Sequence, residues 1–400
     1  MEKTKSDNLY SEEISLIPGP EYSEYVQLNL RKIREFRRNF HLPVIGIAGA
    51  EGKTTTKRMI ASIISQRGKV LETPIDCNSA SVVTSTLLKL DQHYRYVLLE
   101  LGIINRDQFR LAVEISQPNI GLVTNIGEAH LANLGDKYFI ADAKVQLIQQ
   151  LPADGYAVLN IDDDLVSGMD SFSPTRQVIK YGFNNNAHFH ASEIKHFGPD
   201  GMEFLINRYY KLHLPIYCST SVSNALAAVS IARILGFDFS EIIDGLQNNF
   251  ELIPGRGNLI RLKDLYLLDH TYNATVNTVP KAVESLAHFQ RYSKKLILVL
   301  GDLDWLGSAA EKIHANLGYY VSAKPIDVVI TIGHYAKLVG EGIQRINHSQ
   351  KLVLHCDQPE ALPELMVKYL EPHSTILVTG SKSLTLDKPL RKFTQMVGKT

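Results

Sequence analysis

Short apolar runs alternate with helix-like segments along most of the chain, and this alternation constrains its fold more than any other feature. The apolar runs lie at residues 44–48, 96–101, 120–126, 156–161, 296–300, 328–332, 351–354 and 375–378. Each run has the length of a strand, and helical spacing separates one run from the next. That order is typical of parallel strands covered by helices on both faces. We therefore predict an α/β protein.

The pattern divides the chain into three parts. Residues 1–41 contain a polar leader and one helix-like basic segment at 23–40. Residues 42–253 are predicted to form a central parallel-sheet domain of the type that carries a phosphate-binding loop. Residues 254–400 are predicted to form a Rossmann-like C-terminal α/β domain, because the alternation starts again after Pro254. Within the central domain, turn signals and period-two stretches at 178–215 predict a small antiparallel excursion.

Charge and hydropathy exclude several classes of partner. The chain has 42 basic and 42 acidic residues, so no net charge attracts nucleic acid or an anionic membrane. No apolar run reaches the roughly 18 residues that a membrane span needs. The first residues lack the order of a signal peptide, and the cysteines, Cys77, Cys218 and Cys356, lie far apart. We expect a cytoplasmic protein that binds neither nucleic acid nor membrane.

A glycine-containing loop between the first predicted strand and its helix carries the strongest motif. It has the form G-x-x-G-K-T, with Gly49, Gly52, Lys53 and Thr54 at the named positions. Backbone N–H groups of such a loop can surround phosphates, while the lysine contacts the terminal phosphates and the threonine contacts Mg²⁺. Ile47 stands where the general motif has glycine, and a plain turn before a surface helix is the simpler alternative.

Three more residues lie where an open α/β sheet places its ligands. Glu100 ends an apolar strand and suits Mg²⁺, although a solvated acid at a strand end is the alternative. His130 follows the strand at 120–126, where a structural or surface histidine is commoner. Lys144 occupies the apolar stripe of a predicted helix, and its ammonium either reaches the surface or has a function.

These residues belong to a series of short motifs that resembles the Mur ligase family. The motifs run in family order from about residue 42 to the C-terminus, at residues 49–56, 100–102, 124–131, 141–144, 223–228, 254–256, 272–274, 301–302, 306–307 and 380–383. The resemblance implies an ATP- and Mg²⁺-dependent ligase in which a carboxylate attacks the γ-phosphate and an amine takes the resulting acyl phosphate. Such a reaction needs positioning and charge neutralisation rather than a side-chain nucleophile.

The resemblance also assigns roles to individual residues. The implied catalytic residues are Lys53, Lys144 and His130, with Lys144 carbamylated so that it presents a carboxylate to the metal. The implied nucleotide-binding residues are Gly49, Gly52, Lys53, Thr54, Thr55, Asn224 and Arg256. The implied Mg²⁺ ligands are Thr54, Glu100 and His130. The implied substrate-binding residues are Asn78, Asn273 and Lys382, where Lys382 stands in place of a family arginine that engages the carboxylate of the incoming substrate.

Several positions depart from the family pattern. Family members hold a UDP-sugar in an N-terminal domain, and we expect the forty or so residues before the first strand to be too few for one. Glu51 puts an acid in the phosphate loop, His270 replaces an aspartate, and Trp305 replaces a glutamate. Our leading hypothesis is therefore a Mur-type carboxylate–amine ligase whose small-molecule substrate lacks the UDP group, or whose acceptor is supplied by a partner protein.

Two alternatives remain. The first is ligation of a peptidoglycan precursor, with addition of D-alanyl-D-alanine, and the missing domain supplied by another chain. The second is a nucleotide-binding scaffold without turnover, which the departures at Glu51, His270 and Trp305 favour. The joint presence of Lys53, Glu100, His130 and Lys144 argues against the scaffold, because a protein that only binds nucleotide does not need a lysine on an apolar stripe.

Overall fold

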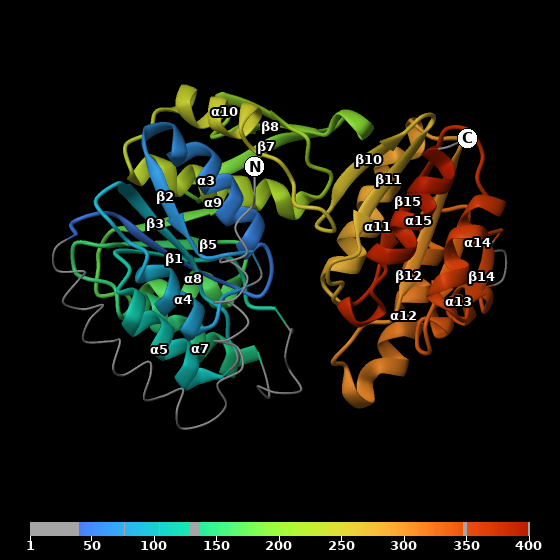
Figure 1. The fold of residues 1–400 in the computed structure, drawn as a ribbon, viewed down its shortest axis with the longest axis horizontal. Coiled ribbons are helices and arrows are strands. Elements are labelled where there is room, and N and C mark those ends of the chain that lie inside the picture. The colour runs from blue at the N-terminus through green and yellow to red at the C-terminus, as the bar shows by residue number, and fades with distance from the viewer. Residues whose placement is uncertain (1–39, 76, 104, 128–136, 347–349, 399–400) are drawn as a thin grey trace, which may run out of the picture. The chain divides into compact units, whose positions relative to one another are not determined.

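The computed structural model describes residues 40–75, 77–103, 105–127, 137–346 and 350–398, so the predicted helix at 23–40 lies outside it except for its last residue. These residues form two compact units, each with its own sheet (Figure 1). The first unit takes the described residues up to Gly127, together with 137–192 and 223–250. The second takes 193–222 and 251–398. The domain boundary near Pro254 stays a prediction from the sequence.

The first unit is built on the parallel part of a nine-stranded sheet, with the strand order β2-β3-β1-β4-β5-β6-β7, and β8 (Met202–Ile206) and β9 (Tyr210–Leu214) continue the same sheet beyond β7. Its strands are β1 (Val44–Ala48), β2 (Lys69–Glu72), β3 (Tyr94–Glu100), β4 (Ile120–Val123), β5 (Tyr156–Asn160), β6 (Val178–Gly182) and β7 (Phe189–His196). The central strands β1 and β4 are buried along their whole length, as expected where helices cover both faces of a parallel sheet.

The predicted antiparallel excursion at 178–215 is wrong in its first half. Strand β6 pairs in parallel with β5, and β7 pairs in parallel with β6. Only β8 (Met202–Ile206) and β9 (Tyr210–Leu214) form an antiparallel hairpin. The period-two pattern misled the prediction because β7 is only half-buried, and such a strand alternates whichever way its neighbour runs.

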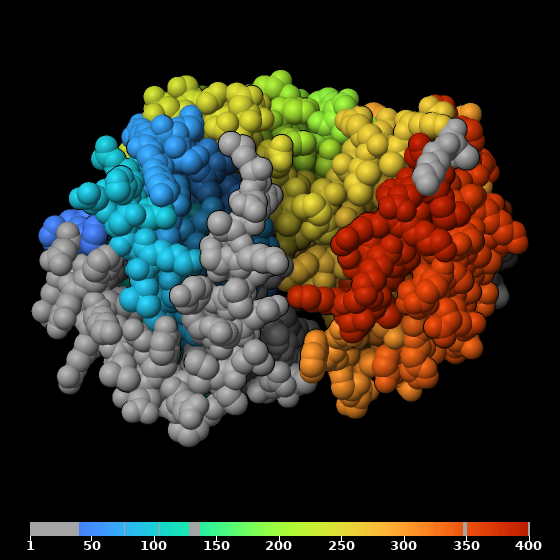
Figure 2. Space-filling model, viewed as in Figure 1, coloured from blue at the N-terminus to red at the C-terminus, as the bar shows by residue number. Residues whose placement is uncertain are grey.

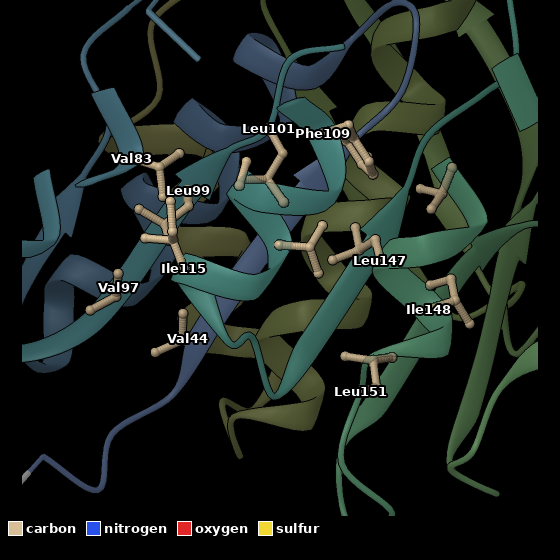
Figure 3. Packing of buried hydrophobic residues seen from close by; sticks show 14 of the residues in the cluster. Val44, Val83, Val97, Leu99, Leu101, Phe109, Ile115, Leu147, Ile148 and Leu151 are labelled. Carbon is tan, nitrogen blue, oxygen red and sulfur yellow. The ribbon is translucent and has the colours of Figure 1, made fainter. Parts of the chain in front are cut away.

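Helices cover both faces of the first sheet (Figure 1). Helices α4 (Ala80–Leu87), α5 (Arg106–Ser116) and α7 (Lys137–Gln149) pack on one face. Helices α3 (Lys53–Ile64) and α10 (Phe239–Asn248) lie together on the other. Phe109 of α5 and Leu147 of α7 point into one apolar cluster with strand residues such as Leu99 (Figure 3). The short helix α8 (Asp164–Ser167) and the long helix α9 (Ser219–Ile234) follow in the described chain, and α9 includes residues of both units.

The second unit has a six-stranded sheet with the order β10-β11-β15-β12-β13-β14. Its strands are β10 (Asn258–Leu262), β11 (Leu265–His270), β12 (Lys295–Gly301), β13 (Val328–Ile332), β14 (Leu352–Cys356) and β15 (Ser374–Thr379). All neighbouring pairs are parallel except β10 and β11. Successive residues of β12 point to opposite faces of the sheet, so Leu298 and its neighbour Val299 enter different apolar clusters. The sheet is therefore covered on both sides.

The helices of the second unit supply those two apolar layers. They are α11 (Thr278–His288), α12 (Ala310–Ser322), α13 (Lys337–Gln344), α14 (Leu362–Lys368) and α15 (Asp387–Gly398). Helices α11, α12 and α13 contribute to one cluster, and α14 and α15 contribute to the other. Figure 2 shows α15, in red, at the surface beside the orange-red residues of α14. The predicted α/β class with parallel sheets is confirmed, and no described helix has the length and apolar character needed to cross a membrane.

Candidate active site

The loop between β1 and α3 has the backbone geometry of an anion site. Gly52 is left-handed, with φ 79°, and an ideal Cβ there would lie 2.4 Å from Oδ1 of Asn224. At Gly49, a Cβ would lie 1.9 Å from Oγ1 of Thr124. Both positions therefore require glycine. No described side chain caps α3 at its first residue, Lys53, so the N-terminal amides of this helix are available to an anion.

Two residues that follow β4 hold this loop in shape. Oδ1 of Asn125 accepts hydrogen bonds from the amides of Ala50, at 3.1 Å, and Glu51, at 2.9 Å. The hydroxyl of Thr124 donates to the Glu51 carbonyl at 2.7 Å. The sequence analysis gave no role to either residue. The available signal was a polar pair directly after a buried strand, at the edge of the sheet where ligands bind.

The lysine and threonine of the loop point in different directions. Nζ of Lys53 donates to the carbonyls of Gly49 and Ala50, at 3.0 and 3.2 Å. This places its positive charge over the loop. The hydroxyl of Thr54 instead donates to Oε2 of Glu100 at 3.0 Å. The structure thus brings Thr54 and Glu100 together, as the resemblance implied.

Glu100 is buried, and both oxygens of its carboxylate accept hydrogen bonds from polar side chains. Its other oxygen, Oε1, accepts from Nδ2 of Asn78 at 3.1 Å, and its backbone amide donates to the Thr73 hydroxyl. The donor set of hydroxyl, carboxylate and amide oxygen suits a hard cation such as Mg²⁺. Predicted residues Thr54, Asn78 and Glu100 therefore form one polar cluster.

Lys57 is a buried member of the same cluster that sequence analysis missed. It lies one turn after Lys53 on α3 and is 0% exposed. Its ammonium donates to the backbone carbonyls of Thr73 and Pro74, and it lies 4.0 Å from Oε2 of Glu100. A lysine is rarely this buried without a partner of opposite charge. Lys57 therefore links α3 to β3 and to the segment that leads to Asn78.

Lys144 is also buried, at 1% exposed, but its ammonium makes a weaker hydrogen bond than that of Lys57. Its ammonium donates to the carbonyl of Asn125 at 3.4 Å. Burial and then the positive charge of Lys53 lower the pKa of Lys144 from 10.5 to about 7, while Asp163 and Glu51 oppose this shift. In a large fraction of the protein molecules, Lys144 is therefore an uncharged amine at neutral pH. Of the two alternatives for this position, the structure excludes an ammonium that reaches the surface.

In the second unit, a second group of predicted residues meets at one aromatic ring. The guanidinium of Arg256 lies 3.8 Å from the ring centroid of Tyr272, and Nζ of Lys382 lies 5.3 Å from the same centroid. Asn273 follows Tyr272 in the chain. Two cations on one ring create a positive region that favours an anionic group.

A buried carboxylate that sequence analysis missed fixes this second group. Asp269 accepts hydrogen bonds from the Gly255 amide at 3.1 Å and from the Thr271 hydroxyl at 2.7 Å. It thereby ties the turn before Arg256 to the turn before Tyr272. The sequence feature that could have identified Asp269 is its place near the end of an otherwise apolar strand.

His270 is neutral at physiological pH. Burial lowers its pKa from 6.5 to about 4, and its Nε2 has no hydrogen-bond partner among the described residues. It therefore cannot supply the negative charge of the aspartate that the resemblance places at this position.

The chain matches known protein families over both units. Residues 47–232 match the Mur ligase middle domain, and residues 255–382 match the Mur ligase glutamate ligase domain. The UDP-N-acetylmuramoyl-tripeptide–D-alanyl-D-alanine ligase of Escherichia coli K12 is 31% identical over 354 residues, which cover 87% of this chain and 76% of the relative. The chain belongs to the Mur ligase family.

Further comparisons agree with this placement. The ligase of the same name from Synechocystis is 34% identical over 293 residues. That match covers 73% of this chain but 62% of the relative, so it spans less than two thirds of the relative's length. Among solved structures, MurF from Acinetobacter baumannii has a TM-score of 0.81 at 28% identity, and covers 92% of this chain and 80% of the neighbour.

One predicted site residue of this Mur ligase cannot be placed. His130 lies outside the described residues, so its part in a metal site stays a prediction. Within the described ranges, no three histidine, cysteine, aspartate or glutamate side chains are grouped so as to hold a metal ion. The other predicted residues fall into the two groups above. The first unit holds Gly49, Gly52, Lys53, Thr54, Thr55, Asn78, Glu100, Lys144 and Asn224, and the second holds Arg256, Asn273 and Lys382.

The buried Lys144 should destabilise the fold. In CO₂-free buffer at pH 7, we expect Lys144→Met to raise the free energy of unfolding by about 4 kcal/mol at most, because the unfolded chain binds a proton that the folded chain releases. The gain in the free energy of unfolding should be largest below pH 7 and disappear as pH rises towards 10.5. Over that range the free energy of unfolding of the wild-type protein itself rises, because its unfolded state loses the extra proton. Denaturant unfolding between pH 6 and 9.5 measures this. An unchanged or lowered stability would contradict it.

Lys57→Met should have the opposite effect. It leaves the Glu100 carboxylate buried without its cation and two carbonyls without their donor, so we expect a loss of about 3 kcal/mol. The exposed Lys89 provides a matched control, and Lys89→Met should change stability by less than about 0.5 kcal/mol. If Lys57→Met and Lys144→Met shift stability in the same direction, pairing with Glu100 is not what distinguishes the two lysines.

Proposed function

We propose that this chain is an ATP-dependent ligase that joins a carboxylate to an amine through an acyl phosphate. The observation that carries the proposal is the phosphate loop of the first unit, where Lys53 lies over the loop and Thr54 is hydrogen-bonded to Glu100. A loop with open helix amides, a lysine and a paired threonine and carboxylate suits a triphosphate with its metal. Membership of the Mur ligase family supports the same reaction class.

The residues fit the roles that a triphosphate requires. Lys53 would neutralise the terminal phosphates, and the N-terminal amides of α3 would bind the phosphate oxygens. Thr54 and Glu100 would hold Mg²⁺, with His130 as a further ligand. The metal, when bound, supplies charge neutralisation at the transferred phosphate. Asn224 lies against Gly52, where it would contact the nucleotide. The family resemblance assigns nucleotide binding to Arg256 of the second unit as well.

The reaction needs no covalent enzyme intermediate. A carboxylate oxygen of the first substrate attacks the γ-phosphorus, and ADP leaves. The amine of the second substrate then attacks the acyl carbon, loses a proton, and displaces inorganic phosphate as the amide bond forms. The chain's contribution is to neutralise the negative charge of its reactants, which is the role we propose for Lys53 in the first unit and for the cations around Tyr272 in the second.

Lys144 fits the carbamate that the family resemblance implies. Only an uncharged amine can attack CO₂, forming an N–C bond and losing a proton, and burial keeps part of Lys144 uncharged at pH 7. A carbamate would replace an energetically unfavourable buried positive charge with a carboxylate that could bind the metal. This role is more specific than nucleotide binding alone, and it argues against the scaffold alternative.

The names of the relatives favour the peptidoglycan alternative for the substrates. Both curated relatives described above are named as ligases that join UDP-N-acetylmuramoyl-tripeptide to D-alanyl-D-alanine. We propose the same pair of small molecules for this chain. The other hypothesis, a substrate without a UDP group or one presented by a protein, rests on residues outside the described ranges and is tested separately below.

Lys53→Ala should abolish the reaction and leave the fold intact. Phosphate release from ATP, with the tripeptide and D-alanyl-D-alanine present and the product confirmed by mass, should fall by at least about a hundredfold, because the variant loses a charge aimed at the phosphates. Lys89→Ala serves as the control and should react like wild type. Turnover by Lys53→Ala at the wild-type rate would mean that the loop is not the phosphate site.

Calorimetry with the UDP-linked tripeptide decides between the two substrate hypotheses. We expect the peptidoglycan substrate to bind in the presence of a non-hydrolysable ATP analogue, with a Kd in the micromolar range. The matched titration uses the same tripeptide without its UDP group. Equal affinity for both, or binding of the UDP-free peptide only, would favour the hypothesis of a substrate without the UDP handle.

A further inference from the structure

A polar cavity of about 610 Å³ lies between two helices of the first unit. It is bordered by α5 and by the C-terminal part of α7, two helices that pack side by side (Figure 1). Its size falls within the roughly 300–1,000 Å³ of small-molecule pockets. The described residues that line it are four charged residues of α5 and three glutamines at the end of α7. None of them belongs to the phosphate loop or to the polar cluster around Glu100.

The lining is polar because each helix turns its apolar side to the core. Phe109 of α5 and Leu147 of α7 are buried in the apolar cluster of the first unit. Arg106, Arg110 and Glu114 follow one another at intervals of four residues, so they form a stripe along another side of α5. The cavity therefore has a charged wall on α5 and an amide wall, made by the three glutamines, on α7.

Gln146 is the buried residue of the amide wall. It is 7% exposed, and its Oε1 has no hydrogen-bond partner among the described residues. Buried polar atoms of native proteins are normally paired with protein, water or ligand, because an unpaired one lowers stability. A half-turn of the side-chain amide exchanges its oxygen and nitrogen and can bring the oxygen to the cavity that Gln146 lines. Gln146 thus offers an acceptor to a molecule that carries an N–H or O–H donor.

The charged wall offers groups of both signs. Arg106 pairs with Asp142 of α7, and Arg110 pairs with Glu114, each at 3.0 Å. Both pairs are partly exposed, and such ion pairs contribute little to stability and can exchange partners. Asp107 is the other acid of the lining. Two arginines and two acids leave the lining without net charge, so it suits a zwitterion better than a polyanion such as a nucleotide phosphate.

We propose that this cavity is a binding site for a short peptide with free termini. The carboxylate of the peptide pairs with Arg106 and Arg110, and its ammonium pairs with the acids Asp107 and Glu114. A peptide N–H donates to Oε1 of Gln146. Because a glutamine amide presents the same donor and acceptor as a peptide group, the amide wall matches a peptide backbone. The proposal goes beyond the ligase function and does not depend on it.

Calorimetric titration of the full chain with trialanine tests the site. We expect saturable binding with a Kd of about 1 mM or tighter, because both termini make charge-assisted contacts. N-acetyl-trialanine and trialanine amide should each bind at least about tenfold more weakly, since each lacks one terminal charge. The proposal is overturned by absence of saturable binding up to about 10 mM trialanine, or by blocked peptides that bind as tightly as trialanine.

Two variants test whether the peptide occupies this cavity. Gln146→Leu keeps the approximate size of the side chain and removes its oxygen, and Arg110→Ala removes one cation from the surface of α5. Each should weaken trialanine binding by about tenfold or more. Gln344→Leu replaces an exposed glutamine at the end of α13 in the second unit, and this matched control should bind like wild type.

Wild-type affinity in both cavity variants would place the peptide elsewhere and overturn the proposal. Circular dichroism checks that each variant is folded. If Gln146→Leu does not fold, Arg110→Ala decides alone, because an exposed arginine contributes little to packing.

Ligase assays separate this site from the proposed function. Amide formation by Arg110→Ala should stay within about twofold of wild type, because Arg110 lies outside the groups proposed for the ligase reaction. Loss of trialanine binding with normal ligation supports a separate peptide site, whereas loss of both would place the peptide at the ligase site and overturn the proposal. If the wild-type protein forms no amide product, the ligase function fails and the titrations still decide the peptide site.

Discussion

The buried carboxylate of Glu100 is the constraint on which the first unit's site depends. Strands β1 and β3 pair in parallel with Ile47 opposite Glu100, so β3 delivers this carboxylate to the edge of the sheet where the loop at Gly49 begins. A charge in that position is costly unless it is fully paired. Thr54, Asn78 and Lys57 provide the pairing, and they come from α3 and from the segment before α4. The pairing of this one carboxylate therefore ties α3 and the segment before α4 to strand β3.

The two buried lysines show how the same side chain serves different purposes. Lys57 has a carboxylate and two carbonyls as partners, so its charge is stabilised and it acts as a structural link. Lys144 has one carbonyl at 3.4 Å, and burial, followed by the positive charge of Lys53, lowers its pKa to about 7. The first arrangement gives stability. The second gives up stability for a reactive amine, which is typical of functional sites.

The second unit achieves its arrangement with backbone hydrogen bonds rather than a buried ion pair. Asp269 fixes the turns before Arg256 and Tyr272, and Asp304 fixes the segment around Lys382. Both carboxylates bind groups within the loops, while the Lys382 side chain is exposed and that of Arg256 is half-buried. The two units thus share one principle: acids at or near strand ends hold the loops that carry the residues proposed to bind ligands.

The sequence by itself determined the α/β class, most strand positions and the phosphate loop. Those features follow from local patterns, since buried parallel strands form continuous apolar runs and a G-x-x-G-K-T loop needs its glycines at fixed places. It did not determine the direction of β6 and β7, because a half-buried strand alternates in either orientation. It also gave no role to Lys57, Asn125 and Asp269, since their partners are distant in sequence and only the tertiary structure brings them together. For Lys144 the apolar stripe left two possibilities, and tertiary burial excluded an ammonium that reaches the surface, while the role of the buried amine stays a prediction.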